Sequence, residues 1–224
     1  MTTDAGFENE IKRSLPKKTS PGRPIYIRKI PSPATWRQDH GGGDERKKFS
    51  TKRPYDFLVV ARWRFPPVAD IIPTISFAFE CKHTFGKIAK APSSRAGKLH
   101  ATLPFSRVGS HQVKGLSEAD AGGVVAGIIW LVELNPDSED FHGLAEGSEV
   151  RDQCWFIPIE TWKGYTAMMG AMRKSLGFDE ITKLGASLTA PAIEIHEDVG
   201  RGTANRYWKM GEFMRRLGAD ARDK

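Results

Sequence analysis

Apolar residues of this chain gather in short runs of strand character. Residues 55–65 and 71–83 are rich in β-branched and aromatic side chains, and the prolines at 66 and 67 separate them. Residues 122–133 form a nearly continuous apolar run, which is typical of a strand buried on both faces, and residues 153–159 have a similar composition. We therefore predict a sheet in which the first two of these strands can pair through a long connection.

Helices are predicted between and around these strands. They cover residues 7–15, about 106–119, 160–176 and 204–217. Ser106 could cap the second helix, although Gly109 and Gly115 weaken its pattern. The third helix has an apolar side made by Trp162, Tyr165, Met168, Met169 and Met172. Gly218 is expected to end the fourth helix.

Two stretches interrupt this pattern. Residues 31–52 show neither hydrophobic period and are rich in Pro, Gly and basic residues, which predicts a loop or protruding arm. Residues 87–103 are basic and predict an exposed loop. Residues 22–30 alternate enough for a strand, and Pro24 favours an edge position.

The order of these elements predicts one α/β domain over residues 1–224, built around a mixed sheet. Within it, residues 31–53 form the arm and residues 177–224 a C-terminal helical extension. The 224 residues are 39% hydrophobic and 27% charged, a globular composition that can bury a sizeable core.

Several protein classes are excluded by composition. The apolar run at residues 124–132 is too short to span a bilayer, and the first residues include acids where a signal peptide is basic. The two cysteines, Cys81 and Cys154, make no disulfide framework, and the scattered histidines have no zinc-site spacing. We therefore expect a cytoplasmic protein that contacts no membrane.

The charge distribution changes this picture. The formal net charge is +7, but residues 11–53 carry a local charge of +10 and residues 81–117 a local charge of +7. The remainder of the chain is therefore acidic, with a charge of −10. Two basic segments on an acidic chain predict a polyanion-binding surface.

The strongest candidate chemistry lies in the first two predicted strands. Asp56 begins one of them, whereas Glu80 and Lys82 lie near the end of the next. Residues two apart in a strand face the same side, so Glu80 and Lys82 point together. If the strands pair, Asp56 lies beside Glu80, and two adjacent carboxylates favour a cation such as magnesium or manganese.

A simpler interpretation is a Glu80–Lys82 pair on a solvent-facing edge with Asp56 in a turn. On pattern alone this alternative is the more common, because short motifs match by accident. The basic segments favour the metal site, since carboxylates beside a DNA phosphate are electrostatically unfavourable unless they hold a metal.

Asp56 followed by Glu80, Cys81 and Lys82 resembles the signature of the PD-(D/E)XK nucleases. The wider order of motifs is similar to that of the RecU-type Holliday-junction resolvases. It is carried by residues 6–8, 79–82, 105–112, 122–124, 127–130 and 155–159, so that the resemblance covers residues 5–176 loosely. It implies a restriction-endonuclease-like mixed sheet flanked by helices, with a basic protruding arm.

The resemblance also implies roles for individual residues. Asp56, Glu80 and the main-chain carbonyl of Cys81 would bind Mg²⁺, with Mn²⁺ as the alternative metal. Lys82 would be the catalytic lysine. Residues 31–52 occupy the place of a stalk that enters the DNA junction.

Two further residues match catalytic positions of the family. Glu8 matches an acid of the first helix that supports the metal site, and Gln112 matches a helix glutamine near the active site. Each has a structural alternative: Glu8 could favour the first turn of its helix, and Gln112 could be an ordinary exposed residue. His83 and His111 flank the site, and either could only line it.

Basic residues near the site are expected to contact DNA phosphates. They are Lys47, Lys48, Lys52, Arg53, Lys87, Lys90, Arg95, Lys98, Arg107 and Lys114. Such contacts position DNA without reading its sequence, and a solvated basic face is the alternative. Trp36 and Phe49 could stack on exposed bases or, as the commoner role, pack the arm onto its domain.

Together these observations predict a metal-dependent endonuclease that hydrolyses phosphodiester bonds in branched DNA, such as four-way junctions, during recombination or repair. Two symmetric cuts require two sites, so a homodimer is expected. A nuclease of the same fold acting on linear or single-stranded DNA remains an alternative, as does a non-catalytic DNA-binding protein. Nucleoid association is expected, in either a cellular or a viral host.

The chain departs from the RecU pattern at two places. Twenty-three residues separate Asp56 from Glu80, which is a longer gap than the pattern has. The residues after Leu176 have no assigned counterpart in the family.

Overall fold

A computed structural model describes residues 3–15, 24–29, 54–62, 74–88, 99–134, 152–181, 192–198 and 206–220. The helices are α1 (Asp4–Ser14), α2 (Ser110–Ala121), α3 (Ile159–Met169), α4 (Phe178–Ile181), α6 (Met210–Asp220) and the 3₁₀ turn η1 (Phe105–Arg107). The strands are β1 (Pro24–Lys29), β2 (Phe57–Arg62), β3 (Thr74–Ile88), β4 (Leu99–His100), β5 (Thr102–Pro104), β6 (Val125–Leu134), β7 (Gln153–Pro158), β8 (Ser175–Gly177) and β9 (Ile193–Ile195).

The main sheet has seven strands and is mixed. Its order is β1-β2-β3-β6-β7-β9, with β4 paired to the end of β3. β3 and β6 are parallel, and α2 lies in the connection between them, whereas the other neighbours are antiparallel. The predicted mixed α/β sheet is confirmed, as is the edge position of the strand that contains Pro24.

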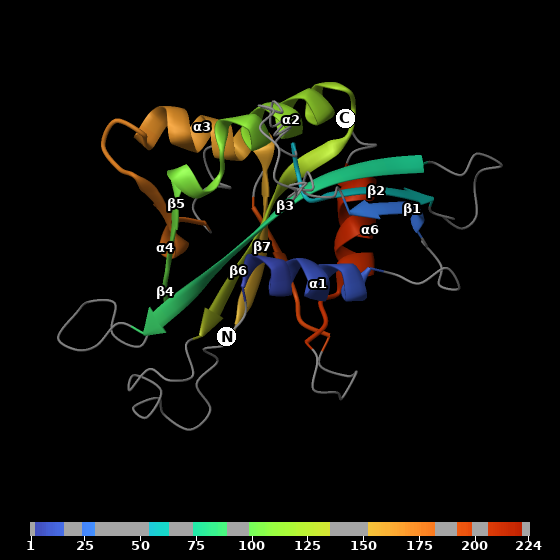
Figure 1. The fold of residues 1–224 in the computed structure, drawn as a ribbon, viewed down its shortest axis with the longest axis horizontal. Coiled ribbons are helices and arrows are strands. Elements are labelled where there is room, and N and C mark those ends of the chain that lie inside the picture. Colours follow the sequence, from blue (N-terminus) through green and yellow to red (C-terminus); the bar gives the residue numbers. More distant parts are fainter. Residues whose placement is uncertain are drawn as a thin grey trace, which may run out of the picture.

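Helices cover both faces of this sheet, with α1 and α6 on one side and α2 and α3 on the other (Figure 1). Alternation along β3 sends Phe79 and Cys81 to the α1/α6 face and Ala78 to the α2/α3 face. Glu80 and Lys82 have the same parity as Ala78, so they belong to the α2/α3 face. The candidate carboxylate and lysine therefore share one side of a central strand.

The end of the chain contributes to both the sheet and the core. β9 pairs with β7, and α6 packs Phe213 against Phe156 with ring centroids 5.1 Å apart. Trp208 and Met214 are also buried in this core, beside Phe7 of α1. The stretch predicted as a helical extension thus supplies a strand as well as a helix.

β3 is longer than expected. It continues to Ile88 because it pairs with β6 as far as Gly86 and with β4 at residues 87 and 88. Lys87 therefore lies in a strand, and the exposed loop predicted over residues 87–103 is wrong at both ends, because β4 and β5 occupy its last residues and Ala101 and Leu103 are buried. The arm at 31–53 and residues 89–98 lie outside the described residues.

The helix boundaries also differ from the predictions. α2 begins at Ser110 rather than at Ser106, because residues 105–107 form the 3₁₀ turn and Gly109 is the cap residue. α3 ends at Met169, and the last helix runs past Gly218. Among the described helices, none is both long and apolar enough to cross a membrane.

The apolar side assigned to the third helix is only partly correct. Trp162 and Tyr165 are buried in the core of the α2/α3 face, as expected. Met168, in the last turn of α3, and Met172, beyond its end, are instead 60% and 72% exposed.

Candidate functional site

Asp56 is held at the entrance to β2 by its contacts with β3. Its N–H donates to the carbonyl of Phe79 at 2.9 Å, and its Oδ2 accepts from the N–H of Cys81 at 2.7 Å. Phe57 pairs with Phe79 in the antiparallel ladder, so Asp56 comes next to Glu80. The predicted pairing of these strands is confirmed, and Asp56 is fully buried.

Glu80 is the centre of a buried polar group. Its Oε1 accepts a hydrogen bond from Lys82 Nζ at 2.6 Å and another from Gln112 Nε2. Glu80 is 1% exposed and Lys82 is 7% exposed. We call Asp56, Glu80, Lys82 and Gln112 the Glu80 cluster.

Burial of the Glu80 cluster decides between the two sequence interpretations. A solvent-facing Glu80–Lys82 pair with Asp56 in an exposed turn is wrong, because all three side chains are buried. Gln112 is also buried, so it is not an ordinary exposed helix residue. Removing the charged side chains of Asp56, Glu80 and Lys82 from water costs several kcal/mol each, which good geometry and hydrogen bonds must offset.

Helix α2 is packed tightly against the segment that holds Asp56. A Cβ atom added to Gly115 would lie 2.3 Å from Cβ of Pro54, so only glycine permits this approach. One turn earlier, Gln112 Oε1 accepts from the N–H of Gly109 at 2.9 Å. The same helix therefore positions Asp56 through Gly115 and Glu80 through Gln112.

Glu8 lies close to this cluster on the opposite side of β3. Burial raises the pKa of the Cys81 thiol well above its usual value, and the negative charges of Asp56, Glu80 and Glu8 raise it further. Glu8 is 4% exposed and lies in the second turn of α1, which begins at Asp4. Its alternative role in stabilising the first turn is therefore not supported.

Side chains replace a strand partner along one edge of β3. β2 pairs with β3 only from Thr74 to Phe79. Beyond that point Asp56 accepts from Cys81 N–H, and Asp4 Oδ1 accepts from His83 N–H at 2.9 Å. Within one strand residue the N–H and the C=O point to the same edge, so the Cys81 carbonyl faces the Asp56 side.

This arrangement fits a hard divalent cation. Two carboxylates, Asp56 and Glu80, and the Cys81 carbonyl supply oxygen ligands at one place, and one ammonium group opposes two negative charges there. No group of three or more His, Cys, Asp or Glu side chains in the described ranges is arranged to hold a metal. The third protein ligand would thus come from the main chain.

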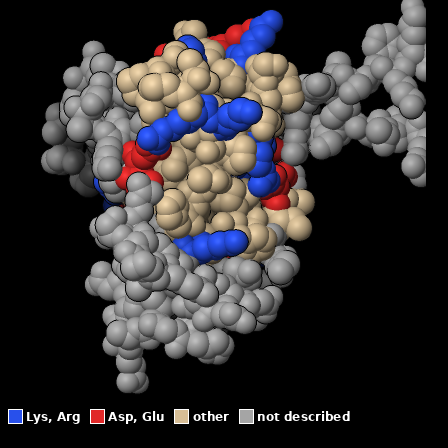
Figure 2. Space-filling view, turned by 90° about the vertical axis from the view of Figure 1, so that its left-hand side faces the viewer, with Lys and Arg blue, Asp and Glu red and all other residues tan. Residues whose placement is uncertain are grey.

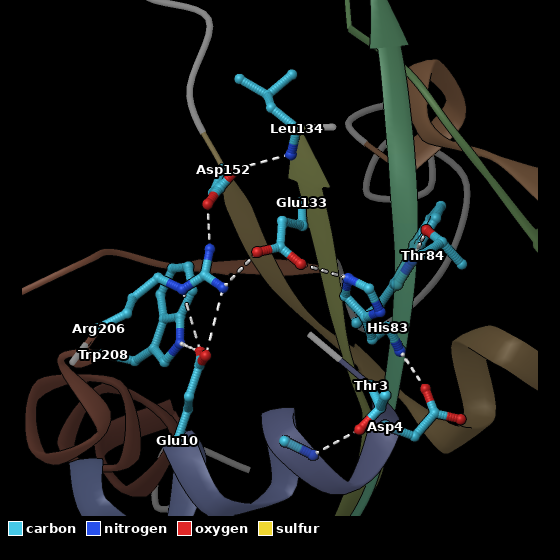
Figure 3. A network of polar contacts seen from close by, with 12 residues as sticks. Thr3, Asp4, Glu10, His83, Thr84, Glu133, Leu134, Asp152, Arg206 and Trp208 are labelled. Carbon is cyan, nitrogen blue, oxygen red and sulfur yellow. Dashed lines mark hydrogen bonds and ion pairs between the residues drawn. The ribbon is translucent and has the colours of Figure 1, made fainter. Parts of the chain in front are cut away.

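A second polar group, which the sequence did not indicate and whose members are buried or half-buried, lies on the α1/α6 face (Figure 3). Arg206 Nε donates to Glu10 at 3.1 Å, Nη2 donates to Glu133 at 3.2 Å, and Nη1 donates to Asp152. We call Glu10, Glu133, Asp152 and Arg206 the Arg206 cluster. Its members come from distant parts of the chain, and no local spacing could have grouped them.

His83 belongs to this second group rather than to the Glu80 cluster. Its Nε2 lies 2.9 Å from Glu133 Oε2, on the opposite face of the strand from Lys82. Burial lowers the pKa of His83, against the raising effect of Glu133. His111 is half-buried near the start of α2.

Three of the expected DNA contacts fall within the described residues. Lys87 and Lys114 are exposed, whereas Arg107 donates to the carbonyl of His83 at 2.9 Å and to Asp4 at 2.6 Å. Figure 2 shows the side on which β3 and β4 end, where described basic side chains are separated by uncharged and acidic surface. The remaining candidates lie outside the described residues, as do Trp36 and Phe49: Lys47, Lys48, Lys52, Arg53, Lys90, Arg95 and Lys98.

No family model matches this chain, and no curated protein matches its sequence. The function therefore has to be inferred from the residues of the site and from their surroundings.

Proposed function

We propose that this protein is a metal-dependent DNA endonuclease of the PD-(D/E)XK type. The observation that supports it is the burial of Asp56, Glu80 and Lys82 together at one edge of a central strand. Functional sites often gather buried ionisable groups, and here two carboxylates share a single ammonium group, which leaves room for a metal. The mixed sheet with helices on both faces is compatible with a restriction-endonuclease-like core.

Asp56, Glu80 and the Cys81 carbonyl would hold Mg²⁺, or Mn²⁺ as the alternative. The bound metal would supply a nucleophilic water and offset the charge that develops on the phosphate. Lys82 would orient that water or stabilise the phosphate oxygens, since its ammonium group lies 2.6 Å from Glu80. Gln112 fixes the Glu80 carboxylate by its hydrogen bond, and Glu8 adds negative charge behind the strand.

Branched DNA is the substrate that we favour. The two basic segments of the sequence surround Asp56 and Glu80, which suits a strongly anionic partner. The order of motifs resembles RecU-type resolvases, and cutting a four-way junction symmetrically requires two sites. The protein would therefore act as a homodimer in recombination or repair.

The test is cleavage of a labelled four-way junction with Mg²⁺ and with EDTA, using wild type and Asp56→Asn. The variant should lose cleavage and keep junction binding. Its fold should persist, because the asparagine oxygen can still accept from the Cys81 N–H. Glu160→Gln is a matched control, since it removes one negative charge from an exposed position of α3.

Undiminished cutting by Asp56→Asn would refute the proposed site. Flap, linear duplex and single-stranded DNA at equal concentration test the substrate, because preferred cutting of any of them would refute a junction resolvase. Salt-sensitive DNA binding without metal-stimulated cleavage would indicate a non-catalytic DNA-binding protein.

A further inference from the structure

A pocket lies beside the Glu80 cluster, where the open edge of β3 meets the first residues of α1. It encloses about 400 Å³, which falls within the range of small-molecule sites. It is lined by Thr84 and Phe85 at the edge of β3 and by Thr3, Asp4, Thr102 and Arg107. Thr84 is two residues beyond Lys82, which places the pocket about 7 Å along the strand from that residue.

The charged groups of this pocket already neutralise one another. Arg107 Nη2 lies 2.6 Å from Asp4 Oδ2, and the other Asp4 oxygen accepts from the backbone of His83. A phosphate group would have to compete with Asp4 for the guanidinium. The pocket is therefore better suited to an uncharged, polar group than to an anion.

One hydroxyl group gives this pocket a hydrogen-bond donor. Thr3 Oγ1 accepts from Gly6 N–H at 3.1 Å. A hydroxyl that accepts in this way still has its own O–H to donate, and it can bond a ring carbonyl oxygen of a ligand. The other β3 hydroxyl, that of Thr84, is buried and accepts from the indole N–H of Trp130 at 2.8 Å.

Phe85 gives the pocket an aromatic surface. It is 38% exposed, and among the described residues it is one of three large apolar side chains with substantial exposure. The ring of His83 contacts it in a T-shaped arrangement, with ring centroids 4.7 Å apart and an interplanar angle of 88°. An exposed aromatic ring that packs against a neighbouring ring is a stacking platform for a flat ring.

We propose that this pocket binds an unpaired nucleobase of the DNA strand that occupies the neighbouring metal site. The inference takes its substrate from the proposed function. A nucleobase is flat, uncharged and edged with carbonyl and amino groups, and it matches the stacking surface of Phe85, the Thr3 hydroxyl and the neutral Asp4–Arg107 pair. Bases become unpaired at junction centres and in single strands, so the pocket would favour such DNA over intact duplex.

The test measures how wild type and a pocket variant each bind two DNA strands, one with bases and one without. The full chain is titrated, in EDTA so that no DNA is cut, into labelled oligodeoxythymidylate of about ten nucleotides or into an abasic strand of equal length. Phe85→Ala should weaken thymidylate binding about 5- to 150-fold, the usual effect of losing one stacked base. Binding of the abasic strand should not change, because the phosphates are the same.

Met172→Ala is the matched control, since it removes another exposed apolar side chain that does not line the pocket. Thr102→Trp would fill the pocket instead of emptying it and should give the same selective loss. An equal loss on both strands, or no loss from either variant, would overturn the proposal.

The same experiment separates the pocket from the nuclease activity. If Phe85→Ala shows the selective loss in EDTA but the wild-type protein cuts no DNA in Mg²⁺, the pocket proposal stands and the nuclease proposal is refuted. If the wild-type protein cuts junctions but Phe85→Ala binds both strands like wild type, the nuclease proposal stands and the pocket proposal is refuted.

Discussion

Lys82 and His83 are consecutive residues of β3, yet their side chains enter two different buried polar clusters. Lys82 contacts Glu80 on the α2/α3 face, whereas His83 contacts Glu133 on the α1/α6 face, which contains the Arg206 cluster. Both clusters contain more acidic than basic groups, which are buried in the Glu80 cluster and mostly half-buried in the Arg206 cluster. Burial of charge is therefore not enough to distinguish a site from a structural network.

The two clusters differ in how the cation meets the acids. Arg206 donates to all three carboxylates of its cluster, and its guanidinium also lies 5.6 Å from the Trp208 ring centroid. Lys82 Nζ bonds to Glu80, while Asp56 is held by a backbone N–H. A planar guanidinium that bridges three acids links separate elements together, whereas two carboxylates with one ammonium can still receive a metal.

The largest expected effect is on catalysis, through Lys82→Met. Cleavage by the folded protein should fall about 100- to 10,000-fold, the range for loss of a group that handles protons or charge in the reaction. The rate of single-turnover junction cleavage in Mg²⁺ measures this loss, with Lys163→Met at a partly exposed position of α3 as control. Full activity in Lys82→Met would make Lys82 a structural residue like Arg206.

The next effect is on stability, through Arg206→Met. Removing the cation leaves one buried and two half-buried acids without it, so the free energy of unfolding should fall by at most about 3–5 kcal/mol, the range for a fully buried pair. Urea denaturation measures this loss, and Arg206→Lys should recover part of it, since lysine keeps the charge but not the planar fork. Cleavage per folded molecule should not change; its loss at full folding would give the Arg206 cluster a part in the reaction.

The smallest expected effect is that of Gly115→Ala, which should change both stability and cleavage. The new methyl group would overlap Pro54, and relieving that overlap should cost about 1–3 kcal/mol of stability. Because Pro54 is two residues before Asp56, cleavage should fall as well. Thermal unfolding and junction cleavage are measured together, with Glu118→Ala at an exposed position of the same helix as control. Unchanged cleavage would mean that α2 does not position Asp56.

The strands that carry the site were predictable from local pattern. Alternation along β3 fixes Glu80 and Lys82 on one face, and the β-branched composition of β2 identifies the strand beside it. The position of Asp56 at the start of that strand follows from the same pattern. The exposure of Glu80 and Lys82 was not predictable, because a Glu and a Lys two residues apart form the same sequence pattern on an exposed edge strand and on a buried strand.

Contacts between distant residues could not be predicted from local pattern. The family resemblance implied that Gln112 lies near the site, and it reaches Glu80 from a helix 32 residues away, whereas nothing in the sequence indicated that Arg206 reaches Glu10 across 196 residues. Both depend on which helix covers which face of the sheet. The C-terminal helix reads as a separate amphipathic segment, and only its packing against Phe156 and Phe79 makes it part of the core.

The sequence by itself determined the α/β class, the strand pair around Asp56 and Glu80, and the common face of Glu80 and Lys82. Those features depend on periods of two and 3.6 residues, which are local properties of the chain. The family resemblance implied that Gln112 and Glu8 lie near these groups, and the tertiary structure brings them there. Only the tertiary structure decided that the groups are buried and that His83 turns instead to the Arg206 cluster. Burial and charge pairing depend on what packs against each face, and that is fixed only when distant segments meet.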